Sequence, residues 1–348
     1  MKEKESMRKT RLVFVVAAIF VLALTNYLFA QMAEIKVGKG DLKIGGILQA
    51  GYDYGMTDDK GNVNGQFTLN RARFLFWGTI VPDKVKYFVQ TETKSAPEIL
   101  DFKMIFMNVL PKTSITVGRF LPNFSLYMPA PTSMLDMINY PLFIIDSRFN
   151  YAMWRQTGFQ TETVLNLVDI NLGLFNGPTN NVADNNDGKD FMFKLAFKPP
   201  TDFAKVSLGA YGWMGNMLMA DDTDLAYNRF GFFGTLNKDK LSLKGEYVMA
   251  TDEVGENVDD VSSGGFYGQV GFKVCDKLEL LARYDSMDPN SDVKDNGLSW
   301  ITIGANHYID GINAMIYLNY IMKIEENDWG AAEKLKNDIV QLQFQIAF

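Results

Sequence analysis

The chain has 348 residues, 47% of them hydrophobic, and a formal net charge of −7 at neutral pH. This acidic balance argues against nucleic-acid binding, because contacts to phosphates require a basic surface. One cysteine excludes an intramolecular disulfide, and one histidine excludes a histidine-rich metal site. The 13% of aromatic residues and the 29 glycines favour strands joined by tight turns over helices.

The first thirty residues have the pattern of an export signal. Lys9 and Arg11 precede an apolar run over residues 12–30 that ends on the small residue Ala30. A basic region followed by such a run is typical of a secretory signal peptide. A permanent membrane anchor is the alternative, since 19 mostly apolar residues just suffice to span a bilayer. We predict a signal peptide at residues 1–30, whose removal takes away five basic and two acidic residues and brings the net charge to −10.

After residues 31–40, which we predict to be a short periplasmic N-terminal segment, apolar and polar residues alternate along the rest of the chain. A period of two residues indicates β-strands with one wet face and one apolar face. The predicted strands cover residues 42–54, 66–81, 84–94, 100–109, 114–121, 156–165, 168–176, 191–198, 203–214, 228–236, 240–250, 265–274, 278–286, 298–309, 314–324 and 338–348.

The connections between these sixteen segments alternate in length. Long polar connections such as residues 177–190 and 251–264 take turns with short ones such as residues 82–83 and 275–277. Bacterial outer-membrane barrels combine short periplasmic turns, longer extracellular loops and an even number of strands. The sequence therefore predicts an all-β, transmembrane, antiparallel up-and-down β-barrel of about 16 strands over residues 41–348, an integral multi-pass protein of the bacterial outer membrane.

The same alternation divides each strand into a lipid face and a lumen face. Leu280, Ala282 and Tyr284 share one side of their strand, whereas Glu279 and Arg283 share the other. A barrel of this size is too wide for side chains to fill and leaves an aqueous channel. Nine cations are predicted to line the pore and set its selectivity: Arg71, Arg73, Lys86, Lys103, Arg119, Lys194, Arg229, Lys244 and Arg283. Four acids are predicted to face the same way: Glu92, Glu246, Glu279 and Asp285.

This excess of lumenal cations indicates an anion preference, because rings of Arg and Lys favour anions. The alternative is that the charges merely keep the lumen wet and pair with one another. Arg283 lies two positions from Asp285 on one face, and Lys244 lies two positions from Glu246. Paired charges cancel much of each other's field, which would leave a weakly selective pore.

The longest connection covers residues 122–155 and is too apolar for a solvated surface loop. Loops of this length are usually functional. We expect it to fold into the barrel and narrow the channel, stiffened by its prolines; a subunit contact or a plug against another loop is the alternative. The candidate constriction charges are Asp136, Asp146, Arg148 and Arg155.

The sequence contains no pattern of residues that indicates an enzyme. His307 shares a face with Ile303 and Ala305, so it points toward lipid, where no third group would orient it as a base. We expect no catalytic residue, no metal and no cofactor. We predict a passive channel for small hydrophilic solutes or anions. One alternative is a sugar or oligosaccharide channel with the aromatic track Trp154, Trp213 and Tyr211, and another is a non-conducting structural or adhesion protein.

Five motifs resemble the phosphate-selective porin O/P family: FTLNRARFLFWGTI (67–80), ITVGRFLPNFSL (115–126), LGLFNG (172–177), NNDGKDF (185–191) and LLARYDSMDPN (280–290). The resemblance implies a sixteen-stranded, usually trimeric outer-membrane porin whose lumenal arginines and lysines guide phosphate or polyphosphate through a constriction. Arg71 and Arg73 match the Arg-x-Arg strand of that family, and Arg119 falls in its VGxF strand. Residues 122–155 differ from the family in lacking a dense run of basic residues.

The last segment, VQLQFQIAF, alternates strictly and is predicted to close the barrel against the first strand. Its terminal Phe348 resembles the signal that the outer-membrane assembly machinery recognises. The expected partners are therefore this machinery, outer-membrane lipid and lipopolysaccharide, the permeating solutes, and two further copies in a homotrimer, but no nucleic acid.

Overall fold

The computed structural model describes residues 34–55, 65–146, 154–177, 184, 186–219, 223–255, 258–325 and 337–348. The predicted signal peptide lies outside the described residues and stays a prediction. No helix in these ranges is long and apolar enough to cross a membrane. The helices described are two short turns, η1 (Thr132–Met134) and α2 (Leu142–Ile145).

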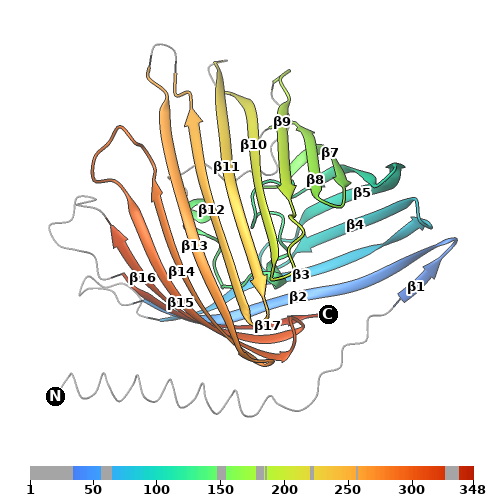
Figure 1. Cartoon of the computed structure of the whole chain (residues 1–348). Coiled ribbons are helices and arrows are strands. Elements are labelled where there is room, and N and C mark those ends of the chain that lie inside the picture. Colours follow the sequence, from blue (N-terminus) through green and yellow to red (C-terminus); the bar gives the residue numbers. More distant parts are fainter. Residues whose placement is uncertain are drawn as a thin grey trace. The chain divides into compact units, whose positions relative to one another are not determined.

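Strands make up nearly all of the rest of the fold (Figure 1). They are β1 (Glu34–Val37), β2 (Gly40–Gly55), β3 (Gln66–Val81), β4 (Val85–Glu92), β5 (Glu98–Leu110), β6 (Thr113–Phe120), β7 (Gln156–Val164), β8 (Val168–Phe175), β9 (Asp190–Phe197), β10 (Lys205–Leu218), β11 (Asp224–Lys238), β12 (Leu241–Asp252), β13 (Val261–Cys275), β14 (Leu278–Asp288), β15 (Leu298–Asp310), β16 (Ala314–Glu325) and β17 (Ile339–Ala347). All sixteen predicted strands are confirmed, and the bounds of β3 agree at both ends.

Each strand from β2 to β17 pairs antiparallel with its neighbours in sequence, and β17 pairs with β2. In that closing pair Val340 lies opposite Tyr54, and Gln343 lies opposite Gly51. The predicted closed sixteen-stranded barrel is therefore confirmed. The additional strand β1 forms a hairpin with β2 and lies within the segment that we predicted to be periplasmic. Its four residues are too few for an alternating pattern to reveal a strand.

The short turns explain how successive strands reverse direction. Asp83, Lys112, Asp239 and Gly311 have positive φ angles of 57°, 61°, 49° and 52°. Left-handed residues are favoured in tight hairpins because they match the twist of the flanking strands. These turns alternate with longer connections such as residues 176–189 and 289–297, as the sequence predicted.

The outer face of the barrel is apolar. Phe102, Phe232 and Ile303 have exposed fractions of 58%, 55% and 57%, whereas the neighbouring Thr302 and Phe233 point inward and are buried. In water such a face would promote aggregation, whereas a bilayer solvates it. The barrel therefore presents to its surroundings the surface that a membrane requires.

The apolar core lies inside the barrel. Residues 121–146, here called the inserted segment, bring the fully buried side chains of Phe124, Leu142 and Phe143 into the lumen. The Phe124 ring lies 4.8 Å from the ring of Tyr211 and 5.6 Å from that of Trp213, both on β10. The prediction that the long connection folds into the barrel is thus confirmed, and part of the lumen is filled with packed aromatic side chains.

We expect Ile303→Arg to destabilise the barrel in phospholipid bilayers by about 2–4 kcal/mol, because a cation on the lipid face near mid-membrane is poorly solvated. Ile303→Phe is the matched control and should leave the unfolding free energy nearly unchanged. The measurement is reversible denaturant unfolding in liposomes. An equal loss in both variants would show that Ile303 does not face lipid.

Candidate functional site: the barrel lumen

The inserted segment begins on one wall of the lumen. The side-chain amide of Asn123 donates to Asn171 on β8 over 2.9 Å. The backbone N–H of Leu126 donates to the Glu246 carboxylate on β12, also over 2.9 Å. Polar side chains that point inward from β8 and β12 thus satisfy the polar groups of the segment, as burial requires.

The segment next reaches the wall formed by β2, β3 and β17. Gln49 on β2 donates to the carbonyl of Thr132 over 3.2 Å, and Arg73 on β3 donates to its hydroxyl over 3.2 Å. Gln345 on β17 donates to the carbonyl of Ser133 over 3.0 Å. Since Leu126 is held on β12, the backbone crosses the lumen between Leu126 and Thr132.

The end of the segment is fixed by a buried ion pair on β14. Arg283 lies 2.8 Å from Asp285 and donates to the carbonyls of Asn139 and Tyr140 over 3.1 Å each. Asp285 in turn accepts a hydrogen bond from the N–H of Leu142 over 3.1 Å. The pairing of Arg283 with Asp285 suggested by their spacing is confirmed.

Asp136 is the charged anchor in the middle of the segment. Its carboxylate accepts hydrogen bonds from Lys244 over 2.6 Å, from Gln269 over 2.7 Å and from the Tyr127 hydroxyl. Burial alone would raise the pKa of Asp136, but the Lys244 cation and these donors outweigh it and hold the pKa below its usual value. The pairing of Lys244 with Glu246 suggested by their spacing is wrong, since Lys244 pairs with Asp136.

The four predicted constriction charges do not lie together at one point of the lumen. Asp136 lies inside the lumen, as described above. Arg155 donates to Asp101 on β5 from two nitrogens over 3.1 and 3.0 Å, in a buried pair. Asp146 follows α2 at the end of the inserted segment. Arg148 lies outside the described residues, and the constriction role of all four stays a prediction.

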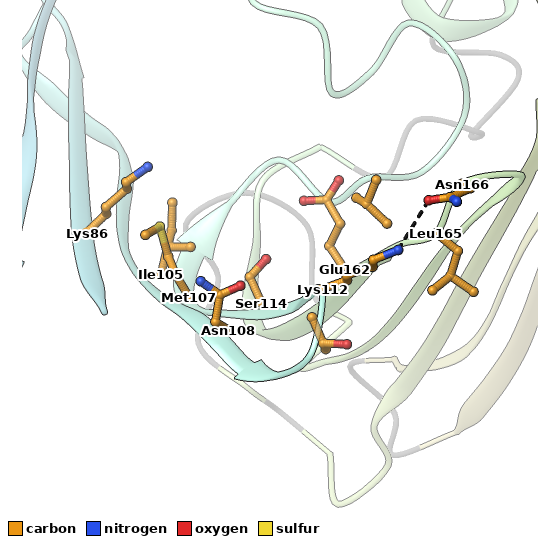
Figure 2. Close-up of a pocket in the computed structure, with 11 residues that line it drawn as sticks. Lys86, Ile105, Met107, Asn108, Lys112, Ser114, Glu162, Leu165 and Asn166 are labelled. Carbon is orange, nitrogen blue, oxygen red and sulfur yellow. Dashed lines mark hydrogen bonds between the residues drawn. The ribbon is translucent and has the colours of Figure 1, made fainter. Parts of the chain in front are cut away.

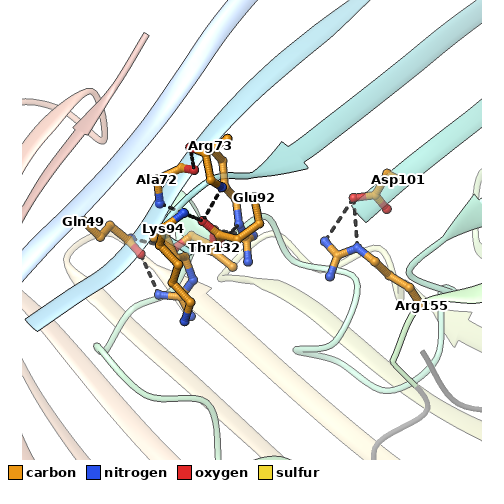
Figure 3. A network of polar contacts seen from close by, with 10 residues as sticks. Gln49, Ala72, Arg73, Glu92, Lys94, Asp101, Thr132 and Arg155 are labelled. Atoms are coloured by element: carbon orange, nitrogen blue, oxygen red, sulfur yellow. Dashed lines mark hydrogen bonds and ion pairs between the residues drawn. The ribbon is translucent and has the colours of Figure 1, made fainter. Parts of the chain in front are cut away.

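Several of the predicted lumenal cations are occupied in holding the structure together. Arg73 pairs with Glu92 over 2.9 Å (Figure 3), and Arg229 pairs with Asp252 over 2.6 Å. Lys194 donates to Asn123 of the inserted segment over 3.1 Å. Lys244 and Arg283 are paired with acids as described above. Such pairs carry little net field into the lumen.

A second set of cations is not compensated in this way. Arg71, Lys86 and Lys103 lie on the adjacent strands β3, β4 and β5, and none of them forms an ion pair with any described carboxylate. Arg71 donates to the Gln49 amide oxygen over 2.6 Å, and the Lys103 ammonium lies 5.2 Å from the centre of the Phe88 ring. Lys86 is exposed.

A cavity of about 580 Å³ opens beside Lys86, next to the short turns (Figure 2). It is lined from β4 to β7 and the adjoining turns, and the Lys112 ammonium within it donates to Asn166 over 3.2 Å. The polar and charged side chains that line it include Lys86, Lys112, Ser114, Glu162 and Asn166. The inserted segment therefore leaves open space next to the β4–β7 wall at this end of the lumen.

The prediction that Arg119 faces the lumen is wrong. In the strand register Arg119 lies opposite Phe102 and Thr157, which are both exposed on the outer face. The alternation already puts Arg119 in phase with the apolar Ile115 and Val117, and its charge does not override the two-residue period. It stands at the end of β6, where a long side chain can reach the polar interface.

The aromatic track of the sugar-channel alternative is not open to the lumen. Trp213 and Tyr211 have exposed fractions of 0% and 1%, because Phe124 packs against both rings and Phe175 and Phe233 stack on them. Trp154 packs against Tyr140 at a ring distance of 5.7 Å. The inserted segment occupies the surface on which a sugar would have stacked. Within the described residues, no group of acids, histidines or cysteines could hold a metal ion.

Residues 213–348 match the family described as phosphate-selective porin O and P. The matched part contains the motif at residues 280–290, so the resemblance seen in the sequence is confirmed there. No sequence among the curated proteins matches the chain.

Several solved outer-membrane proteins share the fold. An anion-selective porin from Comamonas acidovorans superimposes with a TM-score of 0.68 at 13% identity, over 89% of this chain and 100% of that one. In-vitro folded OmpT, an outer membrane protein of Vibrio cholerae, gives a TM-score of 0.65 at 12% identity, over 92% and 100% of the two chains. The outer membrane channel DcaP of Acinetobacter baumannii gives 0.64 at 12%, over 91% and 100%. At these identities the likeness concerns the fold.

We expect Asp136→Asn to lower the thermal midpoint of the barrel at neutral pH, because the neutral amide attracts Lys244 less strongly. The folded-state pKa of Asp136 is lowered, so its contribution is fully present above the usual pKa of 3.8 and is lost as pH falls through the lower folded value. The difference between wild type and variant should therefore disappear in strong acid. Unfolding in detergent, followed by tryptophan fluorescence, measures it.

Asp239→Asn, in an exposed turn, is the control and should behave like the wild type. A thermal midpoint of Asp136→Asn equal to that of the wild type at neutral pH would contradict the anchoring role.

The family match, the closed sixteen-stranded fold and the apolar outer face agree with one another. This chain is a multi-pass β-barrel of the bacterial outer membrane with the porin fold, and over residues 213–348 it matches the phosphate-selective porin O and P family.

Proposed function

We propose that the protein is a passive channel for small hydrophilic solutes with a weak preference for anions. The observation that carries the proposal is the set of three uncompensated cations, Arg71, Lys86 and Lys103, on adjacent strands of one wall. Four of the other predicted lumenal cations, Arg73, Arg229, Lys244 and Arg283, are paired with acids, so they contribute little net field.

Two of these cations, Lys86 and Lys103, lie close together on the wall. Lys86 on β4 lies opposite Ile105 on β5, and Lys103 is two residues before Ile105 on β5. Strand spacing and rise place their Cα atoms roughly 8 Å apart, about one Debye length at physiological salt, so their fields overlap. Arg71 continues this wall on β3, farther from the short turns.

The same wall explains why we propose a preference rather than strict selection. Glu162 lines the cavity together with Lys86 and Lys112, and its negative charge reduces the local field. The proposal covers small anions in general. Phosphate as the natural solute, assembly as a homotrimer, contact with lipopolysaccharide and the role of Phe348 as an assembly signal all stay predictions from the sequence.

One observation favours a second candidate function, a non-conducting structural protein. The aromatic core around Phe124 and Phe143 fills part of the lumen, and it is fixed there by the ion pairs of Asp136 and Arg283. A channel and an occluded barrel differ in conductance, and the same experiment tests both.

We expect the wild-type protein to conduct in planar bilayers, with a reversal potential in a KCl gradient that shows chloride to be more permeant than potassium. Replacing Arg71, Lys86 and Lys103 together by Gln should abolish or reverse this preference, because most of the other predicted lumenal cations are paired with acids.

The control variant is Lys198→Gln with Asp169→Asn, which removes an existing ion pair without changing the net charge. It should retain the chloride preference. An absence of conductance would favour the occluded barrel, and an unchanged preference in the triple variant would show that these three cations are not the filter.

A further inference from the structure

A row of inward side chains crosses β3, β4 and β5, one inward position away from Lys86 and Ile105, which line the cavity. Trp77 on β3 lies opposite Phe88 on β4, and Phe88 lies opposite Lys103 on β5. We call these three residues the aromatic row. Directly paired residues of neighbouring strands point to the same face of a sheet. Lys103 lies 5.6 Å from the ring of the buried Phe120, which places the row in the lumen.

The rings of the row are not part of the packed core. Trp77 and Phe88 are half-buried, and neither belongs to the apolar cluster formed with the inserted segment. Within the described part of the chain, neither ring is in contact with another aromatic ring. This contrasts with Trp213 and Tyr211, which pack against Phe124 of the inserted segment and stack on Phe175 and Phe233 of the wall.

Two lysine side chains lie next to Phe88, at the β4–β5 end of the aromatic row. The Lys103 ammonium lies 5.2 Å from the centre of the Phe88 ring. Lys86, which lines the cavity, is two residues before Phe88 and so points to the same side. Lys43 continues the row on β2, opposite Trp77.

Two adjacent aromatic side chains beside two cations suit a solute that carries both a flat ring and a negative charge. With strands about 4.8 Å apart, the row is about 10 Å long, which gives room for one ring and its carboxylate group. Ring contacts would hold the apolar part of the solute, and the ammonium groups would hold its anionic part.

We propose that the aromatic row binds organic anions with an aromatic ring, and that the channel favours them over non-aromatic anions of equal charge and similar size. This inference rests on the proposed function and specifies its solute class. The hydrogen bond that β3 makes directly to the inserted segment comes from Arg73, four residues before Trp77.

The test compares benzoate with cyclohexanecarboxylate, which share a six-membered ring and one negative charge. Bi-ionic reversal potentials in planar bilayers give the permeability of each relative to chloride. We expect benzoate to be favoured by about two- to tenfold in the wild type, the range of a single aromatic contact.

The variants Trp77→Leu and Phe88→Leu keep an apolar side chain but remove the ring. Each should bring the ratio of benzoate to cyclohexanecarboxylate permeability toward one, without changing the chloride preference in KCl. Lys103→Gln should lower the permeability of both carboxylates. Phe74→Leu, on the lipid face of the same strand, is the control and should change none of these values.

A wild-type ratio of one, or a ratio unchanged in both leucine variants, would overturn the proposal while leaving the chloride preference intact. A wild-type channel without chloride preference would instead overturn the proposed function. Unchanged KCl conductance in the two leucine variants shows that their barrels have folded, so a lost aromatic preference cannot be attributed to misassembly.

Discussion

The hydrocarbon interior of a membrane offers no hydrogen-bond partners to the backbone, and the pairing of β17 with β2 is the consequence on which the rest of the structure depends. Without that pair two strand edges would remain unsatisfied in lipid. With it, every strand from β2 to β17 has a neighbour on both sides, and the two-residue period assigns each side chain to lipid or to lumen. Arg119 obeys this assignment despite its charge.

Closing sixteen strands creates an interior that is too wide for the wall residues to fill. The inserted segment fills part of it and makes this barrel unlike a simple water-filled cylinder. Its aromatic side chains pack against inward rings of β10 and β13, and its polar groups bind inward amides, acids and cations. Buried polar groups must be paired, so the wall charges near the segment serve its attachment.

That attachment divides the lumenal cations into two functional sets. Arg283, Lys244 and Lys194 hold the segment, and removing one partner would leave the other buried without compensation. Arg71, Lys86 and Lys103 lie on the β3–β5 wall and have no such task among the described residues. The cavity and the aromatic row adjoin the same wall, so open space, positive charge and accessible rings coincide on one side of the barrel.

The sequence by itself determined the strands, their faces and the closure of the barrel. These properties follow from local alternation and turn residues, and β3 was therefore predicted to its last residue. The pairing of Arg283 with Asp285 was also predictable, because two positions along a strand point to one face.

Only the tertiary structure decided the partner of Lys244, since Asp136 lies 108 residues away and meets it only when the inserted segment crosses the lumen. The same crossing buries Trp213 while Trp77 remains half-exposed, although both are inward tryptophans on strands. The two-residue period fixes which way a side chain points. Which residues an inward side chain contacts in the lumen depends on the path of the inserted segment, whose sequence does not alternate.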